Sequence, residues 1–338
     1  MIVVLKPHIT KKEEAAVLKE IRRLGYEPRV LRGVERTVIG AIGDERKHHT
    51  LETLTAIFPQ VESVMPVQKR FKLVSREAHQ GNSTINVRGN LIGGKKVQIM
   101  AGPCSVEGEK QLLTTAHAVK KAGATILRGG AFKPRTSPYE FQGLGEKGLK
   151  LLAKARKETG LAIITELLSE QHAEMVAEYA DILQIGARNA QNFQLLIAAA
   201  KTGKPVLLKR GLSMKIEEWL LAGEYVLAND NANLMFCERG IRTFETYTRN
   251  TLDLSTVPII KKESHCPIVI DPSQGAGRAD LVVAMCKGAV AMGADALLIE
   301  VHPNPAEAWS DGAQQLTLEG FAKLMEELKP FIAAAGRE

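Results

Sequence analysis

VQIMAGPCSVEGEKQLLTTAHAVKKAGATILRGG, residues 97–130, contains an apolar segment, a helical segment and a second apolar segment. The two apolar segments, 97–102 and 125–130, lack the strict alternation of apolar and polar residues, which is typical of parallel strands buried on both faces. Between them, KQLLTTAHAVKKAG has the apolar spacing of a helix that ends at Gly123. The stretch therefore predicts a strand–helix–strand unit, the repeating unit of parallel α/β folds.

The same alternation continues toward the C-terminus. Six more apolar segments follow, most of them separated by helical stretches, at 162–167, 181–186, 205–211, 234–240, 267–273 and 296–303. Eight such strands within roughly 250 residues favour a closed (β/α)8 TIM barrel. An open, doubly wound parallel sheet is the alternative.

The first 70 residues have a different organisation. They predict four strands and two helices, in the order 2–7 (strand), 11–25 (helix), 29–33 and 36–43 (strands), 50–58 (helix) and 61–67 (strand). This βαββαβ order is that of a small α+β ferredoxin-like module, which can bind regulators or form dimers and assigns no activity by itself. We therefore divide the chain into a ferredoxin-like domain (1–70), a linker (71–83) and a barrel (84–338) that starts with a hairpin turning at Gly93–Gly94.

Composition limits the classes of function. Of 338 residues, 45% are hydrophobic and 25% charged, as in a soluble globular enzyme with a large core. The N-terminus turns polar after five residues and no apolar run approaches about 18 residues, so we expect a cytoplasmic protein with no membrane partner. The net charge of +7 comes without a basic run or aromatic-interleaved basic stripe, which argues against nucleic acid. The four scattered cysteines are expected to be free thiols, one of them a candidate metal ligand.

Each predicted barrel strand ends in polar residues. Because the loops after barrel strands converge on one mouth, we expect these residues to meet there. Six of them are cations: Arg128, Lys133, Arg135, Arg188, Lys209 and Arg239. Guanidinium groups bind carboxylate and phosphate in bidentate fashion, so the cluster predicts a ligand set with more than one anionic group. A structural network with Glu146, Glu166 and Glu238 is the alternative for part of the charge.

A second group of strand-end residues joins a thiol and two carboxylates. Cys104, Glu300 and Asp311 could together hold a divalent metal at the mouth of the barrel. A buried free cysteine is more often a small core residue, so the spacing alone is a weak signal.

Six long motifs indicate the family. They are AGPCSVE (101–107), LRGGAFKPRTSPYEFQGLGEKG (127–148), QIGARNAQN (184–192), LLKRG (207–211), CERGIRTFE (237–245) and EVHPNPAEAWSDGAQ (300–314). In these motifs, and over essentially its whole length, the chain resembles the 3-deoxy-D-arabino-heptulosonate 7-phosphate (DAHP) synthases. It looks closest to the type I-beta branch, which carries an N-terminal ferredoxin-like domain.

The resemblance implies an activity and its regulation. The implied reaction is an aldol-like condensation of phosphoenolpyruvate with erythrose 4-phosphate and water, which gives DAHP and phosphate. It is the first step of the shikimate pathway of aromatic amino acid biosynthesis. The resemblance also implies a homotetramer and feedback inhibition by tyrosine or phenylalanine through the ferredoxin-like domain.

The family's site residues carry over to matching positions. The residues implied to bind phosphoenolpyruvate are Arg128, Lys133, Arg188, Lys209 and Arg239. Arg135, Thr136 and Ser137 of KPRTS are implied to bind the sugar phosphate, and this motif favours the four-carbon aldose over the substrate of the sister octulosonate 8-phosphate synthases.

Catalytic roles follow from the same comparison and from the chemistry. Lys133 is implied to donate a proton to the forming alkoxide. Glu166 or Glu238 would handle the attacking water, and the choice between them stays open. Asp271 and His302 are the other candidate catalytic residues.

One motif departs from the family pattern. IDPSQGAGR (270–278) has Gln274 where the family has a histidine that binds the metal together with the equivalents of Cys104, Glu300 and Asp311. An amide oxygen is a poorer ligand than imidazole for a transition metal. We therefore expect Gln274 to be a weak fourth ligand to an ion of the Mn, Fe, Zn or Co type, with His302 as a nearby candidate ligand.

Three interpretations of Gln274 follow. The protein is an active synthase with weakened or altered metal use, a related synthase with another aldehyde or no metal, or a non-catalytic paralogue that senses aromatic amino acids. The retained anion-binding residues, Lys133 among them, favour the first.

Overall fold

The structure is a computed structural model, and it describes residues 1–32, 37–43, 51–65 and 70–338. The chain divides into two compact units, residues 1–82 with 262–265 and residues 83–261 with 266–338. The predicted ends of elements at residues 33, 36, 50 and 66–67 lie outside the described residues. Within the described ranges, no helix combines the length and the apolar character needed to cross a membrane.

The N-terminal unit contains a four-stranded antiparallel sheet in the order β2-β3-β1-β4. Its elements are β1 (Ile2–Leu5), α1 (Lys11–Arg23), β2 (Glu27–Arg32), β3 (Thr37–Ile42), α2 (Leu54–Ile57) and β4 (Val61–Met65). Helix α1 begins at a capping box formed by Thr10 and Glu13, and its Val17 and Ile21 are buried in the core. The predicted ferredoxin-like arrangement is confirmed.

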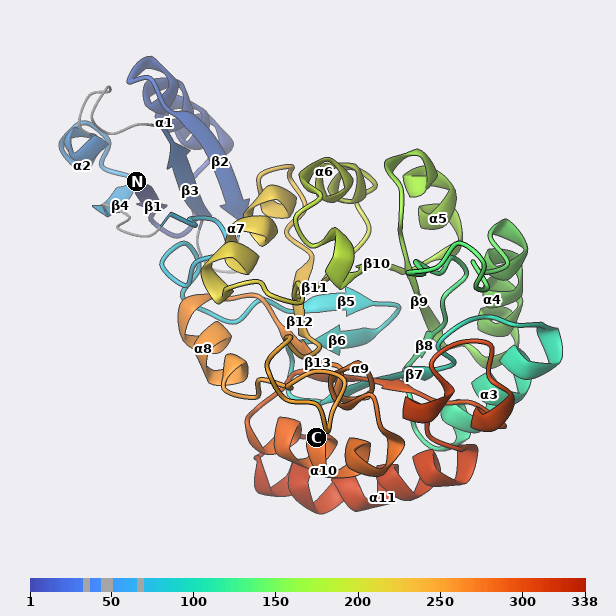
Figure 1. The fold of residues 1–338 in the computed structure, drawn as a ribbon. Helices are drawn as coiled ribbons and strands as arrows, with labels where there is room; N and C mark the ends of the chain where they lie inside the picture. The colour runs from blue at the N-terminus through green and yellow to red at the C-terminus, as the bar shows by residue number, and fades with distance from the viewer. Residues whose placement is uncertain (33–36, 44–50, 66–69) are drawn as a thin grey trace. The chain divides into compact units, whose positions relative to one another are not determined.

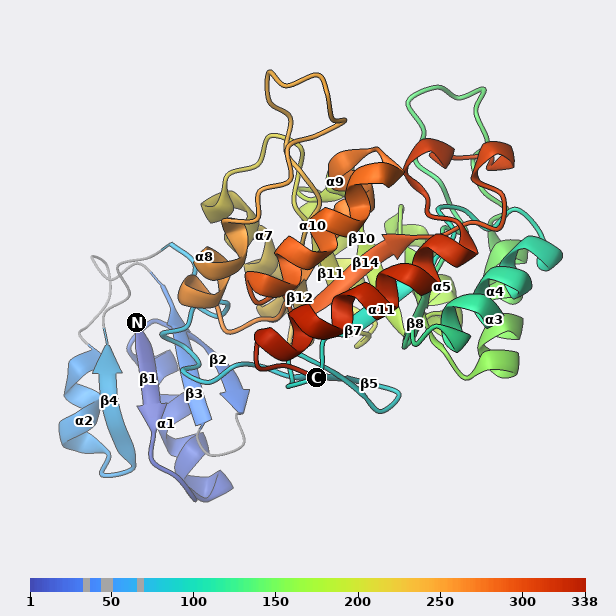
Figure 2. The same cartoon turned by 90° about the horizontal axis from the view of Figure 1, so that it is seen from below.

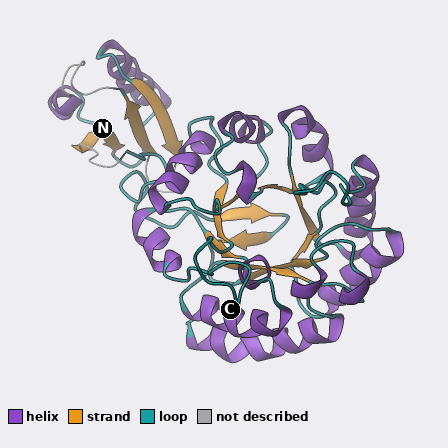
Figure 3. Ribbon diagram, in the orientation of Figure 1, coloured by secondary structure: helices purple, strands orange, loops and turns teal. Residues whose placement is uncertain are grey.

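The larger unit is a closed barrel of eight parallel strands surrounded by helices (Figure 1 and Figure 3). The strands are β7 (Gln98–Gly102), β8 (Ile126–Arg128), β9 (Ala162–Glu166), β10 (Ile182–Ile185), β11 (Val206–Lys209), β12 (Leu234–Glu238), β13 (Ile268–Ile270) and β14 (Ala296–Glu300). Each pairs in parallel with the next, and β14 pairs with β7 to close the ring. The predicted TIM barrel is therefore confirmed over the open sheet.

Helices separate most of the strands, as the sequence predicts. They are α3 (Glu109–Lys121), α4 (Glu146–Thr159), α5 (Ala173–Tyr179), α6 (Phe193–Lys201), α7 (Ile216–Leu227), α8 (Thr256–Glu263), α9 (Pro272–Ala276), α10 (Ala279–Ala291) and α11 (Leu318–Ala334). The short helix α9 matters for the site because it starts directly after β13. Asp271 caps it by accepting a hydrogen bond from the Gln274 backbone, with Pro272 as its first residue.

A hairpin of β5 (Ile85–Val87) and β6 (Asn90–Ile92) closes one end of the barrel. Figure 2 shows it below the strands, opposite the long loops that follow the strand ends. Its apolar side chains pack among inward residues of the barrel strands. The predicted turn at Gly93–Gly94 is wrong. The chain turns instead at Arg88–Gly89, whose φ values of 50° and 87° suit the two-residue turn that matches hairpin twist.

Candidate active site

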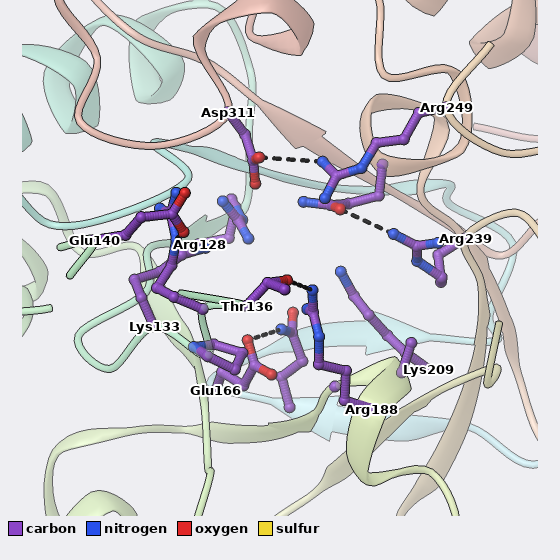
Figure 4. Close-up of a pocket in the computed structure, with 16 residues that line it drawn as sticks. Arg128, Lys133, Thr136, Glu140, Glu166, Arg188, Lys209, Arg239, Arg249 and Asp311 are labelled. Atoms are coloured by element: carbon purple, nitrogen blue, oxygen red, sulfur yellow. Dashed lines mark hydrogen bonds and ion pairs between the residues drawn. The ribbon is translucent and has the colours of Figure 1, made fainter. Parts of the chain in front are cut away.

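A cavity of about 250 Å³ opens where the barrel strands end (Figure 4). Strand direction explains its lining, since parallel strands place their last residues at one end of the barrel. Arg128, Glu166 and Lys209 are each the last residue of a strand. The cationic side chains that line it are Arg128, Lys133, Arg135, Arg188, Lys209, Arg239 and Arg249. The structure thus brings together all six cations singled out in the sequence.

Four of these cations have carboxylate partners. Arg128 lies 3.2 Å from Glu300, and Lys209 lies 2.6 Å from Asp271, with all four side chains buried. The other two pairs are Arg135 with Glu140 at 2.8 Å and Arg249 with Asp311 at 3.1 Å.

Three cations differ from these. Within the described part of the chain, Lys133, Arg188 and Arg239 have no carboxylate within 4 Å. Burial lowers the pKa of Arg239, with Asp271 opposing and Arg249 reinforcing the shift, so an anion bound beside this guanidinium would favour its charged form. Figure 4 shows the nitrogen ends of Lys209, Arg188 and Arg239 directed toward the open centre. We call these three residues the cationic wall of the cavity. Their arrangement favours a ligand that carries anionic groups.

Lys133 lies between the cationic wall and the thiol. Its Nζ donates to Cys104 Sγ at 3.0 Å and lies 3.4 Å from the Cys104 carbonyl oxygen. Burial disfavours the ammonium, but the Cys104 sulfur and the Glu300 carboxylate raise the pKa of Lys133 above its usual value. Lys133 is therefore a buried cation that carries a proton at neutral pH.

The KPRTS loop forms another part of the lining. Arg135 and Thr136 line the cavity, and the Thr136 hydroxyl oxygen accepts a hydrogen bond from Arg188 at 3.4 Å. Ser137 does not line it, and its hydroxyl accepts from the Tyr139 backbone at 3.3 Å. Arg135 and Thr136 thus add a guanidinium and a hydroxyl to the lining, next to Arg188.

The thiol and carboxylate group assembles as expected. One ligand atom from each of Cys104, Glu300 and Asp311 lies within 4.8 Å of the others. Burial, followed by the charge of Glu300, raises the pKa of the Cys104 thiol to about 12, although Lys133 opposes the shift. Burial acts against ionisation of Asp311, yet Arg249 and Lys133 lower the pKa of that carboxyl to about 2.

This donor set fits a divalent metal. A thiol and two carboxylates at this spacing match the ligand types of Zn and related transition ions. A bound dication would also offset the burial and the Glu300 charge that raise the pKa of the Cys104 thiol.

Gln274 lies beside this group, in the first turn of α9. Its Nε2 donates to Glu300 Oε1 at 3.0 Å, and its Oε1 accepts from Arg239 at 3.0 Å. In this orientation the amide oxygen faces the cationic wall, and the amide nitrogen faces the carboxylate.

Of the remaining candidate catalytic residues, one lines the cavity and three do not. Glu166 lines the cavity and accepts from the Gln184 amide at 3.4 Å. The Glu166 side chain can take this position only because residue 186 is glycine, since a Cβ atom there would lie 1.9 Å from Glu166 Oε1. Asp271 does not line the cavity and is held by Lys209.

Glu238 and His302 are not part of the lining either. Glu238 is bound by Arg210 at 2.9 Å and by the Gly240 backbone, and burial raises its pKa despite Arg210. His302 Nδ1 accepts from the Asn304 backbone at 3.0 Å, so Nε2 carries the hydrogen and donates to Glu107 at 3.1 Å. Both ring nitrogens of His302 are thus occupied in this conformation.

Sequence reasoning missed several partners. Arg249 lines the cavity and binds Asp311 and Gln314, yet it lies in the long loop between β12 and α8, outside every motif. Its charge in a loop after a strand end was the one available signal. Gln314, which donates to Glu300 at 2.7 Å, ends a recognised motif but had no assigned role.

Known proteins resemble this chain along its length. Residues 77–334 match the model of the DAHP synthetase I family, and residues 1–69 match that of the DAHP synthase ferredoxin-like domain. A phospho-2-dehydro-3-deoxyheptonate aldolase of Thermotoga maritima is 51% identical over 336 residues, which are 99% of either chain. A 2-dehydro-3-deoxyphosphooctonate aldolase of Caulobacter vibrioides is 33% identical over 255 residues, which are 70% of this chain and 87% of that protein.

Two solved structures are similar as well. The crystal structure of the Thermotoga maritima DAHP synthase aligns with a TM-score of 0.79 and 50% identity, covering 100% of this chain and 98% of that one. A truncated form of the synthase from the same organism aligns with a TM-score of 0.75 and 50% identity, covering 79% and 98% respectively.

Proposed function

The chain belongs to the DAHP synthetase I family, and on that premise we propose that it condenses phosphoenolpyruvate with erythrose 4-phosphate and water to give DAHP and phosphate. The observation that carries the proposal is the layout of the cavity. Arg188 and Arg239, which have no carboxylate partner, line the cavity with Lys209. Arg135 and Thr136 of the KPRTS loop also line it, and the Cys104, Glu300 and Asp311 group lies beside Lys133. Two anionic substrates can bind there without sharing the same cations.

Phosphoenolpyruvate carries a phosphate and a carboxylate. Lys133, Arg188 and Arg239 would bind it, helped by Lys209 and Arg128, whose charges Asp271 and Glu300 partly balance. Guanidinium groups form paired hydrogen bonds with such anions, which fix orientation as well as position. Holding both reactants at fixed positions removes much of the entropic cost of a bimolecular reaction.

Lys133 is the proton donor in this proposal. The alkoxide that forms on the aldehyde oxygen needs a proton, and Lys133 is a buried ammonium that lines the cavity beside the Cys104 thiol. Its pKa is raised, so the proton is present at neutral pH.

Water must then add to the electron-poor C2 of the former phosphoenolpyruvate before phosphate leaves. We assign this water to Glu166, because Glu166 lines the cavity. Glu238 is less suited, since Arg210 and the Gly240 backbone already bind its two oxygens. Glu238, Asp271 and His302 then act as positioning residues that hold their partners in place.

The sugar phosphate would bind at the KPRTS loop. Arg135 supplies the guanidinium and Thr136 a hydroxyl, and Ser137 is the next residue of the same loop. Arg135 must exchange its exposed partner Glu140 for the phosphate.

Cys104, Glu300 and Asp311 would hold a divalent ion of the Mn, Fe, Zn or Co type. When bound, such an ion supplies Lewis acidity toward the aldehyde carbonyl.

Phosphate release from phosphoenolpyruvate tests the activity. We expect release only when erythrose 4-phosphate and a divalent metal are both present, and loss of release after chelation. A five-carbon phosphorylated aldose is the matched control for the sister reaction, whose product has eight carbons. Equal or faster turnover of that aldose, or chelator-resistant turnover in metal-free protein, would contradict the proposal.

We also propose that the ferredoxin-like domain, residues 1–70, makes the enzyme responsive to tyrosine or phenylalanine within a homotetramer. Its match to the ferredoxin-like domain of DAHP synthases supports this role. A chain that begins at Val74 should stay active and lose the inhibition, and light scattering of both chains gives the assembly state. An unchanged inhibitor response in the shorter chain would mean that the domain serves assembly alone.

A further inference from the structure

We propose that Gln274 is a positioning residue that links the carboxylate of Glu300 to the guanidinium of Arg239, and that it is not a ligand of the metal. The inference builds on the proposed function, because it gives Arg239 a role in binding phosphoenolpyruvate. It concerns the position at which this chain departs from its family's pattern.

The partners of the Gln274 amide determine its orientation. Arg239 can only donate hydrogen bonds, and an ionised Glu300 can only accept them. The amide satisfies both because it has an acceptor at Oε1 and donors at Nε2, each 3.0 Å from its partner. Turning the amide to present Oε1 toward the metal group would bring Nε2 against the guanidinium and lose both bonds. The bridging orientation is therefore strongly favoured over the ligating one.

The Gln274 backbone is held as firmly as the side chain. Its N–H donates to Asp271 Oδ1 at 2.9 Å, and its carbonyl accepts from the Asn250 amide at 2.9 Å. Asp271 also binds Lys209, so the start of α9 contacts two cations of the cavity, Lys209 through Asp271 and Arg239 through Gln274. A side chain restrained at every polar atom can transmit position to its partners.

The chain also brings Arg239 close to α9. Gly240 has a φ of 87°, and a Cβ atom there would lie 3.1 Å from the Gly275 Cα atom and 2.6 Å from the Asn250 Cβ atom. Glycine at 240 therefore permits both the left-handed backbone and the close approach of the two segments. This approach places the Arg239 side chain within reach of the amide.

The nitrogen of the Gln274 amide is one of three donors to the Glu300 carboxylate. Oε1 lies 3.0 Å from Gln274 Nε2 and 3.2 Å from Arg128, while Oε2 accepts from Gln314 at 2.7 Å. Three donors leave the carboxylate room for one cation among its four lone-pair directions. Arg128 and Gln314 therefore hold this carboxylate even without Gln274, whereas the Gln274 amide oxygen is a side-chain partner of the Arg239 guanidinium.

Calorimetry on the full-length, chelator-treated protein tests this link. The probes are phosphoenolpyruvate and Mn²⁺, titrated separately into wild type and Gln274→Met, which keeps the side-chain length and removes both hydrogen bonds. We expect phosphoenolpyruvate to bind about tenfold more weakly to the variant, as for loss of one charge-assisted bond, with the Mn²⁺ affinity changed less than about threefold. The reverse split would identify Gln274 as a ligand and overturn the proposal.

A double-mutant cycle sharpens the result. If Gln274 acts through Arg239, then Gln274→Met should cause no further loss of phosphoenolpyruvate affinity in an Arg239→Ala background. Additive losses would overturn the link. Gln142→Met is the matched control, because the Gln142 amide donates only to loop carbonyls, and neither constant should change.

Other outcomes separate this inference from the proposed function. Failure of wild type to bind phosphoenolpyruvate would contradict the function itself. Binding by wild type that equals binding by Gln274→Met would overturn the link alone. Thermal melting of each variant confirms folding, and Gln274→Ala replaces the methionine variant if that one does not fold.

Discussion

The two ends of the barrel are built from the same eight strands but hold opposite kinds of residue. At the end closed by β5 and β6, the buried cluster is apolar and includes Ile85, Val87 and Ile92. At the other end, buried charges such as Lys133, Lys209 and Arg239 line a cavity. Figure 2 shows the hairpin and the long strand-end loops on opposite sides of the barrel.

The difference shows which end of the barrel stabilises the fold and which end lowers its stability. Burying apolar side chains lowers the free energy of the folded state, at about 25 cal/mol per Å². Burying charges costs free energy, even when they are paired, because the desolvation of both partners offsets their attraction. Substitutions at the closed end should therefore change stability, and substitutions at the open end should change binding and turnover.

The largest effect is expected at Lys133. Replacing it with methionine removes the proposed proton donor and one substrate cation, so turnover should fall about a thousandfold or more. Single-turnover phosphate release measures the loss. Lys154→Met, on an exposed surface pair with Glu109, is the control and should behave like wild type. Substantial turnover by Lys133→Met would remove Lys133 from the chemistry.

At the closed end, Ile92→Ala should have a large effect of a different kind. Ile92 is fully buried beneath the barrel, so the truncation should lower the free energy of unfolding by about 2–5 kcal/mol. Urea denaturation gives this value, and steady-state kinetics should show KM values close to wild type. A changed KM with unchanged stability would mean that the two ends are not separate in function.

The stability of the protein should also depend on pH through His265, which does not line the cavity. Burial lowers the pKa of His265, three residues before β13, to about 4, although the Leu73 carbonyl opposes the shift. The unfolded chain protonates this group near pH 6.5 and the folded one does not, so stability should fall as the pH drops from about 6.5 to 4. The loss should reach about 3 kcal/mol.

Unfolding by urea at several pH values tests the effect of His265. In His265→Gln the slope between pH 6.5 and 4 should flatten. An unchanged slope would assign the pH dependence to other groups.

The smallest effect is expected at Arg135, on the rim of the open end. Arg135→Ala should weaken erythrose 4-phosphate binding by about 1.5–3 kcal/mol and leave phosphoenolpyruvate binding nearly intact. Calorimetry with each ligand separates the two, and Arg278→Ala, in an exposed pair with Asp280, is the control. Equal losses for both ligands would mean that the anion sites are not distinct.

Much of this architecture is visible in the sequence. Uninterrupted apolar segments indicate strands buried on both faces, and their spacing requires helices between them, so the barrel can be expected before any coordinates are known. Residues at strand ends, such as Arg128 and Lys209, are predictable site residues because parallel strands all end on one side. The hairpin turn was misplaced because two glycine positions, 89 and 93, could each adopt the backbone a turn requires.

Pairing within the mouth is different, because it depends on distances between segments far apart in the chain. Nothing local to Arg249 or Asp311 indicates that they lie 3.1 Å apart, 62 residues from each other in sequence. The same holds for Glu238, which looks like a site residue at a strand end until Arg210 is seen to bind it.

Gln274 shows both what the sequence can indicate and what only the folded structure determines. Its identity alone indicates a poor metal ligand, because an amide oxygen is neutral. Its orientation depends on Arg239, which follows β12, and Glu300, which ends β14, and the two meet only in the closed barrel. An amide has two different ends, and only the folded positions of a donor and an acceptor can select between them.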